Sequence, residues 1–253
     1  MGTTNLKQSP GSDESVSDGM SLLPDNQQAI AIIPARGGSK RLPDKNLLPL
    51  AGLPVLAHTV QHATAAKSLS EVYVSTDDPK IATMAETYGA TVVTRPEELC
   101  RDTASSESAL LHVLDERLRS GRRDSDIVVF LQCTSPVRAP DDIDRAVELF
   151  LRSQADSLLS VCVNHRFLWR SVNGSAESIN YQYTARPREQ DMAPQYQENG
   201  SIYICRTSLL RRTGNRLGGR IALYEMDYWS SFQLDDPEDL KLLEWIMGER
   251  PGD

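Results

Sequence analysis

The fold is decided at residues 29–46, which read AIAIIPARGGSKRLPDKN. The first part, Ala29 to Ile33, is an unbroken apolar run, which is typical of a strand buried on both faces of a sheet. Two adjacent glycines, Gly37 and Gly38, follow it closely. Four basic residues lie around these glycines: Arg36, Lys40, Arg41 and Lys45. A buried strand that opens into a glycine-containing basic loop indicates an α/β protein with a ligand site beyond the end of its first strand.

The loop from Pro34 to Asn46 has the properties that a triphosphate requires. Adjacent glycines let the backbone turn and bring its N–H groups close to an anion, and the basic side chains add positive charge. The segment fits neither the G-x-x-x-x-G-K-[ST] phosphate loop nor the G-x-G-x-x-G dinucleotide pattern. The alternative is an ordinary glycine turn in a solvated basic loop. The position of the loop after the first strand favours the phosphate interpretation.

Downstream, short apolar runs alternate with longer amphipathic stretches. This alternation predicts parallel strands joined by helical crossovers, with helices on both faces of the sheet. The fold class is therefore α/β, a three-layer sandwich with a mostly parallel sheet in one main domain. Strands are expected at Ala29–Ile33, Glu71–Ser75, Thr91–Thr94, Ile127–Leu131, Ser157–Val163 and Ser201–Cys205. Helices are expected at Pro54–Ala66, Asp78–Tyr88, Ser105–Arg119, Pro140–Gln154 and Pro237–Met247, the last capped by Asp235 or Asp236.

Two segments stand outside this pattern. Residues 1–28 are mostly small and polar, so we expect a disordered tail. The rest of the chain, residues 29–253, is expected to form the main domain. The stretch Asn164–Asn199 is polar and aromatic without clean periodicity, which indicates a flap, a dimer arm or both.

Composition narrows the class of protein. The chain of 253 residues has a formal charge of −8, which disfavours nucleic acid as a partner. Its four cysteines form neither a C-x-x-C pair nor a Cys/His metal spacing, so we expect idle thiols in a reducing compartment. The sequence shows no apolar run long enough to span a bilayer and no secretory signal pattern, so a cytoplasmic protein without a membrane partner is expected.

Five ordered motifs resemble those of the acylneuraminate cytidylyltransferases, also called CMP-sialic acid synthetases. The resemblance runs from about Ile30 to Glu244. The motifs read IPARGGSKRLPDKN at 33–46, VSTDD at 74–78, RPEEL with DTASS at 95–99 and 102–106, QCTSPVR at 132–138, and RPR at 186–188 leading to NGSIY at 199–203. The resemblance implies a fold like that of the nucleotide-diphospho-sugar transferases, with a protruding flap through which the family dimerises.

For the nucleotide, the resemblance implies phosphate contacts from the first loop and base contacts from the region before the third helix. The implied nucleotide-binding residues are Ala35, Arg36, Gly37, Ser39, Lys45, Asn46, Arg95, Ala104 and Ser106. Read without the family, Arg95 is a charge at a strand end, and Ser105 or Ser106 is a helix N-cap.

For the acceptor, the resemblance implies sugar contacts from Gln132, Arg188, Asn199 and Tyr203. A guanidinium such as that of Arg188 suits a sugar carboxylate because its planar fork can bind both oxygens. One departure from the family pattern is Gln197, at a position where the sialic-acid enzymes often carry a second arginine.

For the metal, the family shows two aspartates separated by one residue near the C-terminus, and these hold Mg²⁺ against the phosphates. Here the first position is Gln233 and only Asp235 is in register. Mg²⁺ usually needs one or two carboxylates beside phosphate oxygens and waters, so Asp235 is the expected metal ligand, with Asp236 as the fallback. The expected catalytic residues are Arg36, Lys45 and Asp235.

The resemblance thus implies a nucleotidyltransferase that moves CMP from CTP to the anomeric hydroxyl of a nonulosonic acid, a sialic-acid-like 2-keto sugar, and releases pyrophosphate. The nearest alternatives are enzymes for 3-deoxy-manno-octulosonate or for pseudaminic or legionaminic acid. An alternative from another class is a nucleotide-binding regulator with impaired catalysis, suggested by Gln233.

We expect a homodimer in which Arg188 reaches the partner's site. The four histidines are expected to be structural or surface residues: His58, His62, His112 and His165.

Overall fold

The structure is a computed structural model that describes residues 23, 27–101 and 103–248. Of the tail predicted for residues 1–28, only Leu23, Gln27 and Gln28 fall within this range. The Leu23 side chain is buried in the core, and the N–H of Gln28 donates to Asp126 Oδ2 at 2.9 Å. Leu23 and Gln28 therefore contact the folded domain, and the rest of the predicted tail lies outside the described residues.

The described residues contain one main sheet, two small hairpins and the helices that cover the sheet. The main strands are β1 (Ala29–Pro34), β4 (Glu71–Thr76), β5 (Thr91–Thr94), β6 (Ile127–Leu131), β7 (Ser157–Val163), β10 (Tyr196–Arg206) and β11 (Ile221–Glu225). The hairpins are β2 (Pro49–Leu50) with β3 (Leu53–Pro54), and β8 (Trp169–Val172) with β9 (Ser175–Ser178). The helices are α1 (Val55–Ala65), α2 (Pro79–Thr87), α3 (Ser106–Arg119), α4 (Asp142–Arg152), α5 (Thr207–Thr213) and α6 (Pro237–Gly248).

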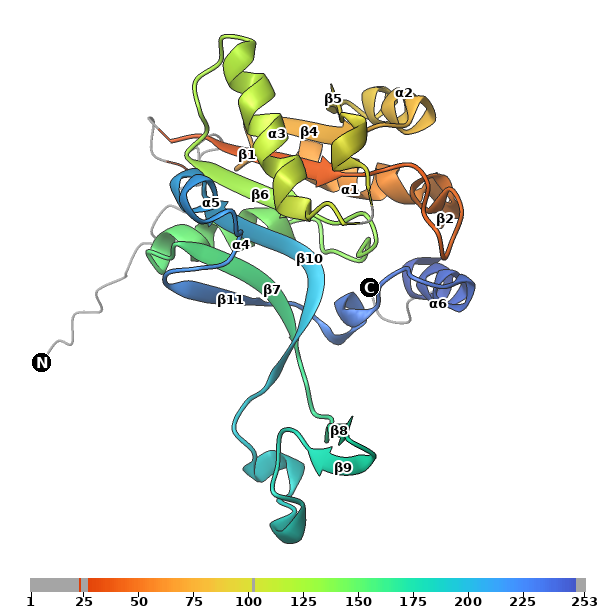
Figure 1. Cartoon of the computed structure of the whole chain (residues 1–253), viewed down its shortest axis with the longest axis vertical. Coiled ribbons are helices and arrows are strands. Elements are labelled where there is room, and N and C mark those ends of the chain that lie inside the picture. Colours follow the sequence, from red (N-terminus) through yellow and green to blue (C-terminus); the bar gives the residue numbers. More distant parts are fainter. Residues whose placement is uncertain (1–22, 24–26, 102, 249–253) are drawn as a thin grey trace, which may run out of the picture.

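The main sheet has the strand order β11-β7-β10-β6-β1-β4-β5 (Figure 1). Strands β6, β1, β4 and β5 are mutually parallel, and β7 is parallel to β11. Strand β10 is antiparallel to both of its neighbours. The sheet is therefore mostly parallel, as predicted, and the carboxyl ends of β1, β4 and β6 meet at one edge.

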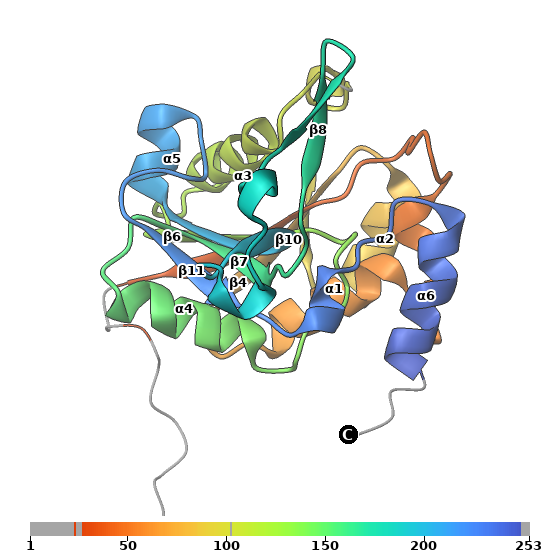
Figure 2. The ribbon, with the colours of Figure 1, turned by 90° about the horizontal axis from the view of Figure 1, so that it is seen from below.

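Alternating side chains of the central strands enter two hydrophobic cores, one on each face of the sheet. Ile33 packs with residues of α1, α2, α4 and α6, whereas Ile30 and Ile32 pack with residues of α3 and α5. Figure 2 shows the sheet between α3 and α5 on one side and α1 and α4 on the other. The predicted three-layer α/β sandwich is confirmed, and its continuous apolar strands follow from burial on both faces.

The predicted elements agree with the observed ones to within about two residues, except in the C-terminal half. Strand β10 begins at Tyr196, five residues before the predicted start at Ser201, because its first half pairs with the outer part of β7. Helix α5 and strand β11 were not predicted. Helix α5 has only seven residues, and β11 lies at the sheet edge with Ile221 and Leu223 exposed, so neither carries a strong periodic pattern.

Residues 164–195 form a protruding arm. Strands β7 and β10 leave the sheet together, and the arm with its β8–β9 hairpin projects well beyond the sheet (Figure 1). Phe167 and Trp169 each pack edge-on against Tyr181, at ring distances of 4.6 and 5.9 Å. The predicted flap at 164–199 is therefore an arm that ends in a small aromatic cluster, with its last residues already in β10.

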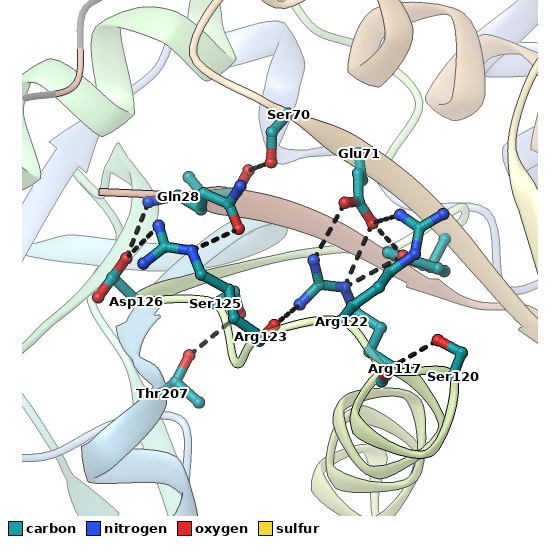
Figure 3. Close-up of polar contacts among 12 residues, drawn as sticks. Gln28, Ser70, Glu71, Arg117, Ser120, Arg122, Arg123, Ser125, Asp126 and Thr207 are labelled. Atoms are coloured by element: carbon teal, nitrogen blue, oxygen red, sulfur yellow. Dashed lines mark hydrogen bonds and ion pairs between the residues drawn. The ribbon is translucent and has the colours of Figure 1, made fainter. Parts of the chain in front are cut away.

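A polar network joins the sheet to α3 at the amino ends of the strands (Figure 3). Glu71 accepts hydrogen bonds from Arg117 at 3.0 and 3.2 Å and pairs with Arg122 at 2.6 Å, and Tyr73 donates to the same carboxylate. Burial alone would raise the pKa of Glu71, but the bonds from Arg117, Tyr73 and Arg122 outweigh it and lower the pKa from 4.5 to about 2. This network fastens β4 to the end of α3.

The start of α6 differs from the expectation that Asp235 or Asp236 caps it. The carboxylate of Asp239 accepts from the N–H of Asp235 at 2.9 Å and from that of Asp236 at 2.8 Å. This is the back-bonding half of a capping box, in which a carboxylate inside the first turn bonds the residue before the helix. The Asp235 side chain instead faces Lys45.

In the part of the chain that the structure describes, no helix is long and apolar enough to cross a membrane.

Candidate nucleotide site

The loop 35–46 leaves the carboxyl end of β1, and Gln132 follows the neighbouring strand β6. Between them lies a cavity of about 190 Å³. It is lined by Pro34, Arg36, Ser39, Lys45, Asn46, Ser106, Phe130, Gln132, Cys133 and Thr134. Six residues predicted for the nucleotide or the sugar thus come together from three separate segments of the chain.

The loop is held in place by hydrogen bonds from its N–H groups to Ser75 in β4 and to Asp77 just after that strand. The N–H of Ala35 donates to Ser75 O at 2.9 Å, and that of Gly37 donates to Asp77 Oδ1 at 2.8 Å. In this structure protein acceptors bind both N–H groups, and the implied contacts of Ala35 and Gly37 with the nucleotide stay a prediction. Gly38, at φ 63°, makes the turn that the adjacent glycines were expected to allow.

Side chains of the same loop brace its two ends. Arg36 donates to the carbonyl of Cys100 at 3.1 Å, and Asn46 donates from Nδ2 to the carbonyl of Arg36 at 3.1 Å. Asn46 therefore fixes the backbone of the arginine that lines the cavity. A cation held in this way can meet a phosphate without first being ordered.

Lys45 lies at the opposite end of the loop and reaches the C-terminal segment. Its Nζ donates to Leu234 O at 3.0 Å and pairs with Asp235 Oδ1 at 3.2 Å. Lys45 is mostly buried, whereas half of the Asp235 side chain is exposed. The structure thus brings the expected catalytic lysine and the expected metal ligand into direct contact, although 190 positions separate them in sequence.

On the side predicted for the base, Ser105 and Ser106 have separate roles. Ser105 caps α3 and accepts from the N–H of Ser108 at 3.2 Å, so Ser106 can face the cavity. Arg95 is buried and donates to Ser75 O at 2.7 Å and to Ser75 Oγ at 3.1 Å, and burial lowers its pKa. Arg95 and Ala104 are not among the residues that line the cavity described above.

Gln132 stands where β6 meets the cavity, and a buried arginine holds its backbone. Arg138 donates to Gln132 O at 3.0 Å and to Ser201 O at 2.9 Å, which ties β6 to β10. Burial lowers the pKa of Arg138 to about 10, so it remains a cation at neutral pH.

Two predicted sugar contacts point elsewhere. Asn199 is fully buried: its Oδ1 accepts from Ser160 Oγ at 2.6 Å, and its Nδ2 contacts Met226 Sδ at 3.2 Å. Tyr203 is buried against Phe130 at 5.4 Å and donates to Glu198, and burial followed by this bond raises its pKa to about 12. Both side chains are buried among the strands and bonded to protein partners, and their implied contact with a sugar stays a prediction.

Arg188 lies on the arm, with 74% of its side chain exposed. Its guanidinium pairs with Asp191 at 2.7 and 3.2 Å. The structure does not bring it to the cavity of its own chain. The motif identified Arg188 as a candidate sugar contact, but it could not show how far this residue lies from the nucleotide loop of its own chain.

Three cavity residues were not among the predicted site residues. Phe130 lies near the end of β6, and Cys133 and Thr134 follow that strand. Burial raises the pKa of Cys133 to about 12, so the thiol is protonated and is no nucleophile. The only available signal was position, since each of these residues lies at or next to the carboxyl end of an apolar strand.

For metal binding, residues 23, 27–101 and 103–248 contain no group of three or more His, Cys, Asp or Glu side chains that could hold an ion. Asp235 is a single half-exposed carboxylate beside the cavity. One carboxylate combined with phosphate oxygens and water fits the way in which Mg²⁺ is bound next to nucleotides.

The main sheet is mostly parallel, and a loop with basic side chains borders a cavity at the carboxyl ends of its strands. This arrangement is typical of nucleotide-binding α/β proteins. Within this class, a family model described as "Cytidylyltransferase" matches residues 30–248. The chain belongs to the cytidylyltransferase family.

Curated relatives agree with this assignment. N-acylneuraminate cytidylyltransferase A of Danio rerio is 36% identical over 209 residues, which are 81% of this chain and 47% of the relative. N-acylneuraminate cytidylyltransferase of Escherichia coli O18:K1:H7 is 33% identical over 216 residues, 84% of this chain and 50% of the relative. The chain spans about half the length of the curated relatives that it matches.

Solved structures show the same fold. CMP:2-keto-3-deoxy-manno-octonic acid synthetase complexed with CTP aligns with a TM-score of 0.66 at 21% identity, over 88% of this chain and 99% of that one. A 4-diphosphocytidyl-2C-methyl-D-erythritol synthase also aligns with a TM-score of 0.66, at 14% identity over 87% and 98% of the two chains. The predicted likeness to the nucleotide-sugar transferase fold is confirmed.

Proposed function

We propose that this chain transfers CMP from CTP to the anomeric hydroxyl of a nonulosonic acid and releases pyrophosphate. The observation that carries the proposal is the cavity in which Arg36, Ser39, Lys45 and Asn46 face Gln132. The N-acylneuraminate cytidylyltransferase relatives support the choice of base and sugar class.

In the proposed reaction, the anomeric oxygen forms a bond to the α-phosphorus of CTP, and the bond from that phosphorus to the β-phosphate oxygen breaks. The cations of Arg36 and Lys45 stabilise the charge that develops on the leaving pyrophosphate. The proton of the anomeric hydroxyl passes to the carboxylate of Asp235. No protein nucleophile is needed, because the sugar oxygen attacks directly.

We propose that Asp235 also binds Mg²⁺, with Asp236 as the fallback ligand. When bound, Mg²⁺ supplies positive charge to the phosphate oxygens. Because Lys45 lies 3.2 Å from Asp235, the lysine and the metal ligand serve the same part of the nucleotide. The Gln233 amide, which replaces the first family aspartate, leaves a single carboxylate in register.

The sugar and the assembly are part of the same proposal. Arg188 and the aromatic cluster lie on the arm, away from the cavity of their own chain, and Gln197 lies in β10 where the arm returns to the sheet. We propose a homodimer in which the arm crosses to the partner and Arg188 of each chain meets the sugar carboxylate in the other chain's site. The exposed Trp169 and Tyr183 would be covered in that assembly.

The test is formation of CMP-sugar and pyrophosphate from CTP and Mg²⁺ with a panel of 2-keto acid sugars of eight and nine carbons. The nonulosonic acids should be the best substrates, and GTP and UTP should be poor donors. Preference for the eight-carbon sugar would reassign the acceptor. Clear CTP binding without turnover on any sugar would favour the nucleotide-binding regulator instead.

A further inference from the structure

Arg138 is a buried cation that ties three elements together beside the cavity. Only 7% of the residue is exposed. Its Nη1 donates to Thr59 Oγ1 in α1 at 3.1 Å, and its Nη2 donates to the carbonyl oxygens of Gln132, after β6, and of Ser201, in β10. All three acceptors are neutral groups. The guanidinium therefore makes the hydrogen bonds of a structural tie without an anion among its partners.

Within residues 23, 27–101 and 103–248, no carboxylate forms an ion pair with Arg138. Asp142 acts on it electrostatically, but the oxygens of this carboxylate accept from Arg145 at 2.8 Å, from Tyr224 at 2.7 Å and from the N–H of Ala139 at 2.6 Å. A buried charge without a counter-ion destabilises a fold. Because a neutral amide could also donate to carbonyl groups, the tie alone does not account for a charged side chain here.

The charge of Arg138 acts on the wall of the cavity. Burial raises the pKa of Cys133, which lines the cavity, and the charges of Arg138 and Lys45 both act on this thiol in the opposite direction. On α1, burial and then Arg138 lower the pKa of His62 to about 4, so His62 is neutral at pH 7. Buried charges are screened much less than exposed ones. Arg138 and Lys45 thus supply positive potential to the same wall.

We propose that Arg138 is a positioning residue of the nucleotide site: its hydrogen bonds hold the wall at Gln132, and its buried charge is balanced by the phosphates when CTP is bound. The inference rests on the nucleotide-binding part of the proposed function. It adds a cation behind the wall to Arg36 and Lys45, which line the cavity. It also gives a reason for an arginine at a position where the bonded partners are neutral.

The test is the affinity of the full chain for CTP, CMP and cytidine, measured by isothermal titration calorimetry, with cytidine in competition against CTP. Arg138→Gln keeps hydrogen-bond donors and loses the charge. Its loss of affinity should be about tenfold greater for CTP than for uncharged cytidine, with CMP between them, because the missing charge acts on the phosphates. Arg152→Gln, at an arginine of α4 with 71% of its side chain exposed, is the matched control and should bind all three ligands like the parent.

Arg138→Lys provides a second test, which also serves if Arg138→Gln does not fold. Burial lowers the pKa of a lysine, so its charge should be lost between pH 6 and 9, whereas the arginine of the parent stays charged. The CTP affinity of the variant relative to the parent should therefore fall about tenfold over this range. The relative affinity for cytidine should stay constant.

Two results would show that Arg138 is a structural tie only. They are equal losses of CTP and cytidine affinity in Arg138→Gln, and a relative CTP affinity of Arg138→Lys that does not change with pH. CTP binding without turnover on any sugar would overturn the proposed transfer reaction and leave this inference standing. Failure of the parent to bind CTP would overturn both.

Discussion

At the scale of single residues, Lys45 is the group that connects the two ends of the chain at the site. It lies in the first loop, yet its Nζ contacts Leu234 and Asp235 near the C-terminus. The sequence motif indicated a phosphate contact for Lys45. The contact with Asp235 could not be predicted, because nothing in a sequence gives the distance between two loops.

Replacing Lys45 with Ala should lower kcat/KM by about a hundredfold or more, since a fixed cation is lost from the leaving group. The variant should still fold, with a thermal midpoint only slightly below that of the parent, because the hydrogen bonds to Leu234 and Asp235 are its main lost contacts. The measurement is pyrophosphate release, with the exposed Lys67→Ala as a control that should behave like the parent. Release at the parent rate by the Lys45 variant would show that the loop assignment is wrong.

At the scale of elements, the start of α3 separates a structural serine from a functional one. Ser105→Ala should lower the free energy of unfolding by about 1 kcal/mol, because it removes the cap that accepts from Ser108. Ser106→Ala should instead raise the KM for CTP and leave the unfolding midpoint nearly unchanged. Urea unfolding and CTP titration of both variants check this. If both variants changed the unfolding free energy and the KM for CTP alike, the assignment of Ser105 to helix capping and Ser106 to CTP binding would be contradicted.

The arm is the other element that carries a prediction. Trp169→Glu should weaken the proposed dimer by at least tenfold in dissociation constant, because it places a charge in an apolar contact. Leu118→Glu is the matched control, since Leu118 on α3 is 44% exposed and Trp169 is 47% exposed. Sedimentation equilibrium over a range of concentrations measures both. A dimer that is unaffected by Trp169→Glu would place the interface away from the arm.

Much of the fold was predictable at this scale because continuous apolar strands such as Ile127–Leu131 follow directly from burial on both faces. Strand β11 and helix α5 were not predictable, since an exposed edge strand and a seven-residue helix leave weak patterns. The site was predictable where it follows strand ends, as at Gln132. The burial of Asn199 and Tyr203 could not be predicted, because the alternation of strand side chains decides whether a motif residue faces the core, and a motif does not give that alternation.

At the scale of the whole molecule, the Glu71 network makes stability depend on pH. Glu71 has a pKa of about 2 in the folded protein against 4.5 as its ordinary value, so its contribution is fully present above about pH 4.5. That contribution is lost as the pH falls toward 2. Glu71→Gln should therefore lower the unfolding midpoint at pH 7 by about 5 °C, for a loss on the order of 2 kcal/mol.

The difference in free energy of unfolding between the parent and Glu71→Gln should become smaller as the pH is lowered from 4.5 toward 3. Chemical unfolding over this range, monitored by circular dichroism, measures it. The control is Glu177→Gln on the arm, which removes a carboxylate from an exposed pair with Arg170. The free energy of unfolding of this variant should differ little from that of the parent at any pH in the range.

The Glu71 network lies at the amino ends of the same strands whose carboxyl ends carry the nucleotide loop. A strand of six residues separates the two ends by about 20 Å. Substitutions at the two ends of the strands can therefore have independent effects. Changes around Arg117 and Glu71 can alter the stability of the protein toward heat and acid. Changes at the other end can alter the specificity for nucleotide and sugar without lowering that stability.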